Sequence, residues 1–211
     1  MTKQRIGVLG GGLMGHGIAY LFAAAGHPVG IFEPAAPVRD AIPARLEAIR
    51  KLLDGDAAIL PRIAIGDRLA DAVTNADVVI EAAPEKLDLK QKIFAEVEAL
   101  VAPDTILASN SSALRPTDIG RGLVRRDRMI GTHFWNPPHL VPLVEVIETE
   151  VTSAATVEAT MRLMRGAGKS PCMSGAMSPA SSAIASSMRS SARRSHCWRT
   201  ASPMPRRSMK W

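Results

Sequence analysis

The chain has 211 residues, of which 46% are apolar and 22% charged, a composition that allows a packed core and excludes wholesale disorder. The sequence contains no run of about 18 uncharged apolar residues, so we expect no membrane-spanning helix. The formal net charge of +6 belongs to the last 41 residues, which hold seven basic residues and no acid, whereas residues 1–170 carry 19 basic and 20 acidic residues. A nearly neutral body argues against a nucleic-acid-binding domain.

Strands and helices alternate along the first 170 residues. Short apolar strands are expected at residues 6–9, 29–32, 63–65, 78–80, 105–108, 129–133 and 141–147. Helices with apolar residues at helical spacing are expected at 18–25, 38–53, 89–100 and 155–165, with Pro43 weakening the first turn of the second. This order predicts an α/β fold, a Rossmann-type doubly wound, mainly parallel sheet with helices on both faces.

Residues 172–211 show neither the period of a strand nor that of a helix. The two cysteines lie in this region without the spacing of metal ligands, so we expect no metal site. We expect a nucleotide-binding domain at residues 1–171 and an irregular basic tail at 172–211. Six glycines between residues 7 and 17 interrupt the apolar N-terminal stretch, which disfavours a secretory signal and indicates a cytoplasmic protein.

A glycine-rich loop follows the first expected strand and opens the first helix. Its Gly10-x-Gly12-x-x-Gly15 pattern is typical of a dinucleotide site: Gly10 allows a tight turn, Gly12 a close approach to a pyrophosphate, and Gly15 helix–strand packing. Glu33, at the end of the second strand, is placed to bind ribose hydroxyls, and its carboxylate disfavours a 2′-phosphate. The loop therefore predicts NAD rather than NADP; the alternative is a glycine-rich turn with Glu33 merely solvated.

A second segment carries candidate chemistry at the carboxyl end of a strand. His133 is placed where ligands bind in open parallel sheets, and Glu145 lies in the next strand among apolar residues. A buried carboxylate beside a histidine holds the imidazole in one tautomer and stabilises its protonated form. We expect the pair to act as a general base, although a lone histidine is more often structural.

Four stretches together resemble the L-3-hydroxyacyl-CoA dehydrogenase family over residues 4–171. They are residues 10–19, Glu81-Ala-Ala-Pro-Glu85 with Lys90, Ala108-Ser-Asn-Ser-Ser112, and His133-Phe-Trp-Asn-Pro137 with Leu143-Val-Glu-Val-Ile147. The resemblance implies an NAD-dependent enzyme of fatty-acid β-oxidation. It also implies an acyl-CoA substrate and a homodimeric parent, with no nucleic-acid or membrane partner.

The resemblance also assigns roles to individual residues. It implies that His133 is the catalytic base, Glu145 its partner, and Ser112 the hydroxyl that binds the substrate's C3 oxygen. Asn136 corresponds to an asparagine behind the histidine. The cofactor-side residues that it implies, besides the three loop glycines and Glu33, are Leu13, Met14, Glu85, Lys90 and Asn110. Alternatives remain: Ser112 as a helix N-cap, and Glu85 with Lys90 as a solvated charge pair.

The resemblance stops after Pro171. Family members continue with a segment like V-x-V-x-D-x-P-G-F-I-x-N-R and then a helical domain that binds acyl-CoA and forms the dimer. When the codons of residues 172–185 are read one base earlier, they permit D-x-P-G-F-I-x-N-R, with the family's asparagine at the place of Ile184. We infer a frameshift near codon 171, which makes residues 172–211 an out-of-frame translation that replaces the substrate domain.

Two other functions fit parts of the sequence. A non-catalytic nucleotide-binding module could use the basic tail to contact nucleic acid or an anionic membrane, because charge alone can support such binding. The tail lacks interleaved aromatic residues and an amphipathic stripe, which disfavours this alternative. A third possibility is a relic that binds the cofactor without turnover.

Overall fold

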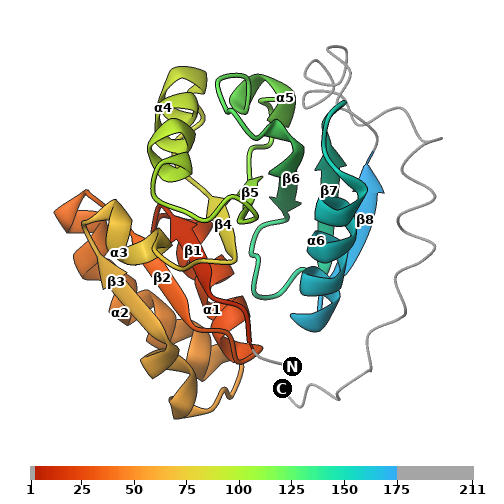
Figure 1. Ribbon diagram of the computed structural model, residues 1–211. Coiled ribbons are helices and arrows are strands. Elements are labelled where there is room, and N and C mark those ends of the chain that lie inside the picture. Colours follow the sequence, from red (N-terminus) through yellow and green to blue (C-terminus); the bar gives the residue numbers. More distant parts are fainter. Residues whose placement is uncertain (1–2, 175–211) are drawn as a thin grey trace. The chain divides into compact units, whose positions relative to one another are not determined.

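The structure, a computed structural model, describes residues 3–174 and consists of one eight-stranded sheet with helices on both faces (Figure 1). The strands run in the order β3-β2-β1-β4-β5-β6-β7-β8. Their bounds are β1 Ile6–Leu9, β2 Val29–Phe32, β3 Ile63–Gly66, β4 Val78–Glu81, β5 Ile106–Ser109, β6 Met129–Phe134, β7 Leu143–Glu148 and β8 Ser170–Ser174. Neighbouring strands are parallel except β6 and β7, which pair antiparallel. The expected doubly wound α/β fold is confirmed.

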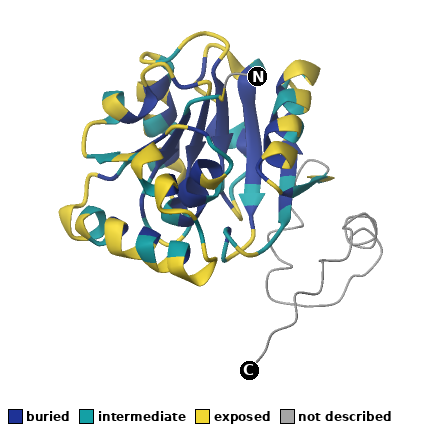
Figure 2. Cartoon of the chain, turned by 90° about the horizontal axis from the view of Figure 1, so that it is seen from below, coloured by how far each residue is buried: buried dark blue, intermediate teal, exposed yellow. Residues whose placement is uncertain are grey.

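Two apolar clusters cover the two faces of the sheet, and the central strands β1, β4 and β5 between them are buried (Figure 2). One face packs against α1 (Gly15–Ala24), α2 (Ala36–Leu52), the 3₁₀ helix η1 (Ala57–Arg62) and α6 (Ala154–Gly166). The other packs against α3 (Leu69–Val73), α4 (Leu87–Glu98) and α5 (Pro116–Ile119). A second 3₁₀ helix, η2 (Arg126–Arg128), precedes β6. Strands that are buried on both faces consist of unbroken apolar runs, which is why these strands could be predicted from the sequence.

The strand register places the last residues of β2, β1, β4 and β5 in one row with the third residue of β6. Phe32, Leu9, Glu81, Ser109 and Gly131 are successive neighbours across β2, β1, β4, β5 and β6. The loops that follow these strands therefore gather at the carboxyl edge of the sheet, the edge where open α/β sheets bind ligands. The glycine loop follows β1, and His133 is the fifth residue of β6.

Helix α2 and strand β8 differ from the sequence-based expectation. Helix α2 starts at Ala36, two residues before the expected start, so Pro43 lies inside the helix rather than in its first turn. Strand β8 includes residues 172–174, which were expected to be irregular, because their backbone pairs with β7. Residues 175–211, the rest of the expected tail, lie outside the described part of the chain. Within residues 3–174, no helix is long and apolar enough to cross a membrane.

Candidate active site

The turn between β1 and α1 depends on two glycines. Gly10 has a φ of +97°, which favours glycine, and its amide donates to the Phe32 carbonyl at 2.8 Å. A Cβ built on Gly15 would lie 1.7 Å from the Gly10 carbonyl oxygen, so a side chain there would displace the turn. These two positions close the loop and bring the start of α1 against the end of β1.

Gly12 has a different environment, because a Cβ built on it would meet no atom within 4 Å. Its backbone faces open space, as a close approach to a ligand requires. Within residues 3–174, the amides of Gly12, Leu13 and Met14 have no hydrogen-bond acceptor. Free N–H groups at the start of a helix suit the oxygens of a pyrophosphate. These loop residues therefore fit the pyrophosphate of NAD.

Leu13 and Met14 complete the loop in opposite ways. The side chain of Leu13 is 70% exposed, so it projects from the loop toward the open side. Met14 is partly buried against the core and directly precedes α1. Leu13 is thus placed to contact a bound cofactor with its side chain, whereas Met14 offers its backbone amide.

Glu33 holds the loop from the neighbouring strand. Its Oε2 accepts a hydrogen bond from the Gly11 amide at 2.8 Å, and its Oε1 accepts one from the Ala35 amide at 3.0 Å. The side chain is 8% exposed at the end of β2. Each carboxylate oxygen retains a lone pair for a further donor, which suits the hydroxyls of a ribose.

His133 and Glu145 lie opposite each other on the antiparallel strands β6 and β7. The His133 Nδ1 is 2.9 Å from the Glu145 Oε2, as expected from the sequence. A carboxylate only accepts, so Nδ1 carries the proton of the neutral ring and Nε2 keeps a lone pair. The Trp135 ring lies 6.0 Å from the imidazole, centroid to centroid, and is 39% exposed. This geometry suits a general base at Nε2.

The loop after β5 is fastened to the end of β6. The Asn110 Oδ1 accepts a hydrogen bond from the Phe134 amide at 2.9 Å, directly beside His133. Ser112, two residues later, is exposed in this loop. Helix α5 has Arg115 as its N-cap residue, so Ser112 does not cap it. An exposed hydroxyl on a fastened loop is available to a ligand.

A buried ion pair lies beneath this loop and the loop after β4. The Lys90 Nζ is 2.6 Å from the Glu81 Oε1, and the two side chains are 1% and 0% exposed. Glu81 also accepts hydrogen bonds from the Ser109 hydroxyl and the Ala83 amide, each at 2.6 Å. These contacts tie the ends of β4 and β5 together. Both Glu81 and Ser109 lie in stretches that resemble the family, although the resemblance assigns neither of them a role.

Glu85 links the loop after β4 to the loop after β5, and it also contacts Lys90 of the ion pair. Its Oε1 accepts hydrogen bonds from the Ser111 hydroxyl and from the amides of Ala113 and Leu114, the last two at 3.0 and 3.2 Å. Burial by itself raises the pKa of Glu85, but these hydrogen bonds and the Lys90 charge lower it overall. Glu85 is therefore a carboxylate that orders residues 111–114, including Ser112.

Two residues lie differently from their expected places. Lys90 was expected to line the cleft, yet its ammonium is buried against Glu81, the Ala83 carbonyl and Glu85. Asn136 was expected behind the histidine, but it is exposed, and within residues 3–174 no hydrogen bond joins it to His133. Lys90 thus supports the loops from below, while Glu145 occupies the position behind His133.

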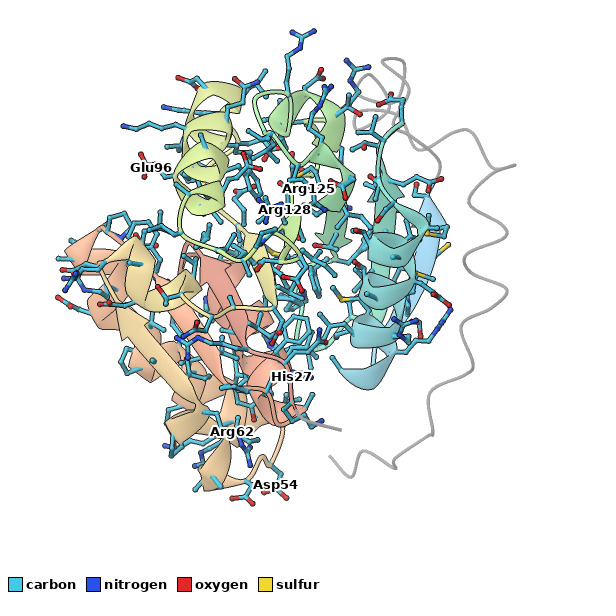
Figure 3. All side chains as sticks on the ribbon, viewed as in Figure 1. His27, Asp54, Arg62, Glu96, Arg125 and Arg128 are labelled. Atoms are coloured by element: carbon cyan, nitrogen blue, oxygen red, sulfur yellow. The ribbon has the colours of Figure 1, made fainter. Side chains whose placement is uncertain are left out.

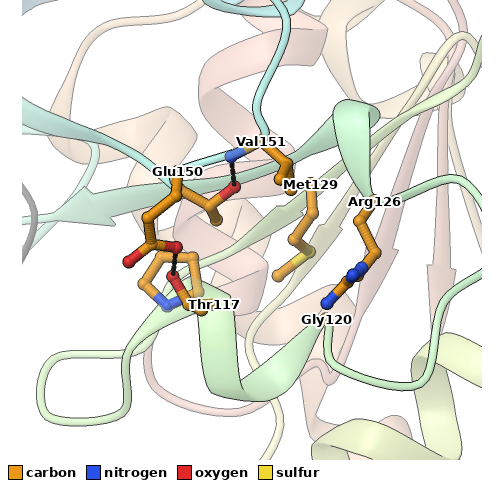
Figure 4. Close-up of a pocket in the computed structure, with 8 residues that line it drawn as sticks. Thr117, Gly120, Arg126, Met129, Glu150 and Val151 are labelled. Carbon is orange, nitrogen blue, oxygen red and sulfur yellow. Dashed lines mark hydrogen bonds between the residues drawn. The ribbon is translucent and has the colours of Figure 1, made fainter.

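A small pocket elsewhere on the sheet is separate from this site (Figure 4). It is lined by residues of α5, the first residue of β6 and the turn after β7, among them Thr117, Met129 and Glu150. The Thr117 hydroxyl donates to the Glu150 Oε2 at 2.8 Å across it. Met129 starts the strand that carries His133 near its other end, so the pocket lies at the amino edge.

Comparison with known proteins gives consistent matches. A family model described as the NAD-binding domain of 3-hydroxyacyl-CoA dehydrogenase matches residues 5–176. The human mitochondrial hydroxyacyl-coenzyme A dehydrogenase is 36% identical over 181 residues, covering 80% of this chain and 58% of that protein. The 5-formyl-3-hydroxy-2-methylpyridine 4-carboxylate 5-dehydrogenase of Mesorhizobium japonicum is 33% identical, covering 80% and 56%.

A solved structure shows the same arrangement. The 3-hydroxybutyryl-CoA dehydrogenase of Escherichia coli K12 superposes with a TM-score of 0.76 and 32% identity, covering 84% of this chain and 39% of that one. The chain spans little more than half the length of the two relatives above.

Proposed function

The chain belongs to the 3-hydroxyacyl-CoA dehydrogenase family, whose NAD-binding domain it contains, and on this premise we propose the reaction that its site serves. In an intact protein the site binds NAD on the Gly10–Gly15 loop and oxidises the 3-hydroxyl of a 3-hydroxyacyl-CoA to a 3-oxoacyl-CoA. The observation that carries the proposal is the hydrogen bond between the His133 Nδ1 and the Glu145 Oε2 at the edge of the sheet that bears the loop.

His133 acts as the general base in this proposal. Its Nε2 takes the proton of the 3-hydroxyl, and the resulting imidazolium donates both N–H groups, one of them to Glu145. Glu145 stabilises that positive charge and fixes the ring. NAD bound on the loop supplies the acceptor for the hydride that leaves C3.

Ser112 donates a hydrogen bond to the C3 oxygen as its carbonyl character grows, which is the role of an oxyanion-hole donor. Two contacts hold its loop in place: Asn110 is tied to Phe134, and Glu85 accepts from Ser111 and the amides that follow Ser112. Lys90 and Glu81 act as positioning residues, because they join the strand ends from which both loops start.

The family supports a proposal for the substrate and the partners. The relatives include enzymes named for acyl-CoA substrates, which supports an acyl-CoA here. We propose a homodimeric parent in the cytoplasm, with residues 1–171 as its NAD-binding domain. Residues 172–211 are then an out-of-frame segment.

We expect the described site to bind NAD. Calorimetric titration of the 211-residue chain with NAD and with NADP tests the cofactor half. We expect saturable binding of NAD and weaker binding of NADP. Absence of NAD binding by a folded chain would refute the proposal.

A further inference from the structure

His16 contacts the dinucleotide loop from the first turn of α1. Its Nδ1 lies 2.5 Å from the carbonyl oxygen of Gly12, four residues earlier. The carbonyl only accepts, so Nδ1 carries the proton. The loop glycine itself has no side chain and faces open space. The His16 backbone amide also donates to this carbonyl, at 3.5 Å. The imidazole makes the shorter contact, and it is the side-chain group that fixes the direction of the Gly12 carbonyl.

Fixing that carbonyl also fixes an amide that faces the ligand. The Gly12 C=O and the Leu13 N–H belong to one rigid peptide plane and point in opposite directions. Holding the oxygen against His16 therefore aims the Leu13 N–H away from the helix, and this N–H has no acceptor within residues 3–174. We propose that His16 is a positioning residue for NAD, which orients the Leu13 amide toward the pyrophosphate and couples cofactor binding to proton uptake. The inference rests on the proposed NAD site.

The proton coupling follows from the charges around His16. Burial, followed by the nearby Arg45 of α2, lowers the pKa of His16, although its hydrogen bond to Gly12 opposes the effect. His139, in the loop between β6 and β7, has its pKa lowered by burial and then by His16 and Lys169. A Cβ on Gly17 would lie 3.2 Å from the His139 Nδ1, so this ring packs against the same turn of α1. The charged side chains that lower the pKa values of His16 and His139 are all basic.

An anion bound at the loop would oppose the effect of these basic side chains on the two imidazoles. The pyrophosphate of NAD places negative charge beside His16 and His139, which raises their affinity for protons. Linkage then requires that NAD bind more tightly as the pH falls through the range in which these imidazoles titrate. A purely structural role for His16 would not produce this dependence.

Two substitutions of His16 distinguish the effect of its hydrogen bond on NAD binding from the effect of its charge. His16→Asn keeps a donor near the position of Nδ1 but cannot titrate, whereas His16→Phe removes both. At pH 8 we expect His16→Phe to weaken NAD binding by about five- to tenfold, the worth of one hydrogen bond, and His16→Asn to restore most of it. Between pH 8 and pH 6 we expect NAD affinity to rise roughly three- to tenfold in the original chain, and less in both variants, which keep only the His139 contribution.

His27 supplies a matched control, because its Nδ1 bonds a backbone carbonyl, that of Gln4, at 2.9 Å. It lies between α1 and β2, at the amino edge of the sheet (Figure 3). His27→Asn should leave NAD affinity and its pH dependence unchanged. NAD affinity that is unaltered by His16→Phe, or an equal pH dependence in His16→Asn and the original chain, would overturn the inference while leaving the NAD site in place. Absence of NAD binding by the original chain would instead overturn the proposed function.

Discussion

Glu81 and Lys90 form an ion pair at 2.6 Å in which neither side chain is more than 1% exposed. Glu81 closes β4, and its carboxylate also holds the Ser109 hydroxyl at the end of β5. A buried pair of this kind adds little net stability over apolar residues, but loss of one partner leaves an uncompensated buried charge. Its value here is positional, since it joins the strand ends that precede the Glu85 and Ser112 loops.

Lys90→Met should therefore destabilise the domain by about 3–5 kcal/mol, because the Glu81 carboxylate loses its counter-charge. The double variant Glu81→Leu with Lys90→Met should recover much of that loss. Urea denaturation followed by circular dichroism measures both effects. The positional role predicts that the double variant, although stable, binds NAD less tightly; full stability of Lys90→Met would disprove the account of the pair.

The glycine loop offers a pair of variants with opposite effects. Gly12→Ala places a methyl group in open space, so stability should change by less than about 1 kcal/mol while NAD binding falls at least tenfold. Gly15→Ala places its Cβ against the Gly10 carbonyl and should unfold or strongly destabilise the chain. Gly122, whose Cβ would also meet no atom, serves as the control, and Gly122→Ala should alter neither quantity. Unchanged NAD affinity in Gly12→Ala would place the pyrophosphate elsewhere.

Glu33→Ala should weaken NAD binding and narrow the preference for NAD over NADP. The substitution removes the acceptor for the ribose hydroxyls together with the repulsion of a 2′-phosphate. It also releases the Gly11 amide, which now donates to Glu33 at 2.8 Å. Fluorescence titration with both cofactors measures the preference, and equal affinities before and after the change would remove Glu33 from the site.

Lys169 should make the stability of the domain depend on pH above neutrality. It is buried, donates to the Pro138 and Val141 carbonyls at 2.6 and 2.9 Å, and burial lowers its pKa from 10.5 to about 8. Between those two pH values the folded state has released a proton that the unfolded state still holds, so raising the pH favours folding. Relative to Lys169→Met, the free energy of unfolding should rise by up to about 3 kcal/mol across this window. A constant difference between the two proteins in urea denaturation would contradict the depressed pKa.

The main strands were predictable from the sequence because they are buried on both faces and therefore read as apolar runs. Strand β8 and helix α3 were not predicted. The five residues of β8 include Pro171 and no apolar run, and β8 forms because β7 offers a backbone partner. Helix α3 has only five residues, too few for a helical period to stand out.

The site was predictable to a different degree in each part. The His133–Glu145 contact was anticipated because the two residues belong to neighbouring strands and the family resemblance pairs them. The burial of Lys90 was not predicted. Its partner Glu81 lies nine residues earlier, and the ion pair forms only when α4 packs against the sheet. The contact of His16 with Gly12 was not predicted, because a histidine that follows a glycine loop belongs to no recognisable sequence pattern.

The central claim is that His133, supported by Glu145, is the base of an NAD-dependent 3-hydroxyacyl-CoA oxidation. The direct measurement is NADH formation from NAD and 3-hydroxybutyryl-CoA by a protein made with the reading frame that we propose after codon 171, beside its His133→Gln and Glu145→Gln variants. We predict turnover by the restored protein, a loss of about 10²- to 10⁴-fold in kcat for His133→Gln, and a smaller loss for Glu145→Gln. NAD affinity should be the same in all three proteins. A His133→Gln variant that binds NAD and retains full kcat would contradict the account.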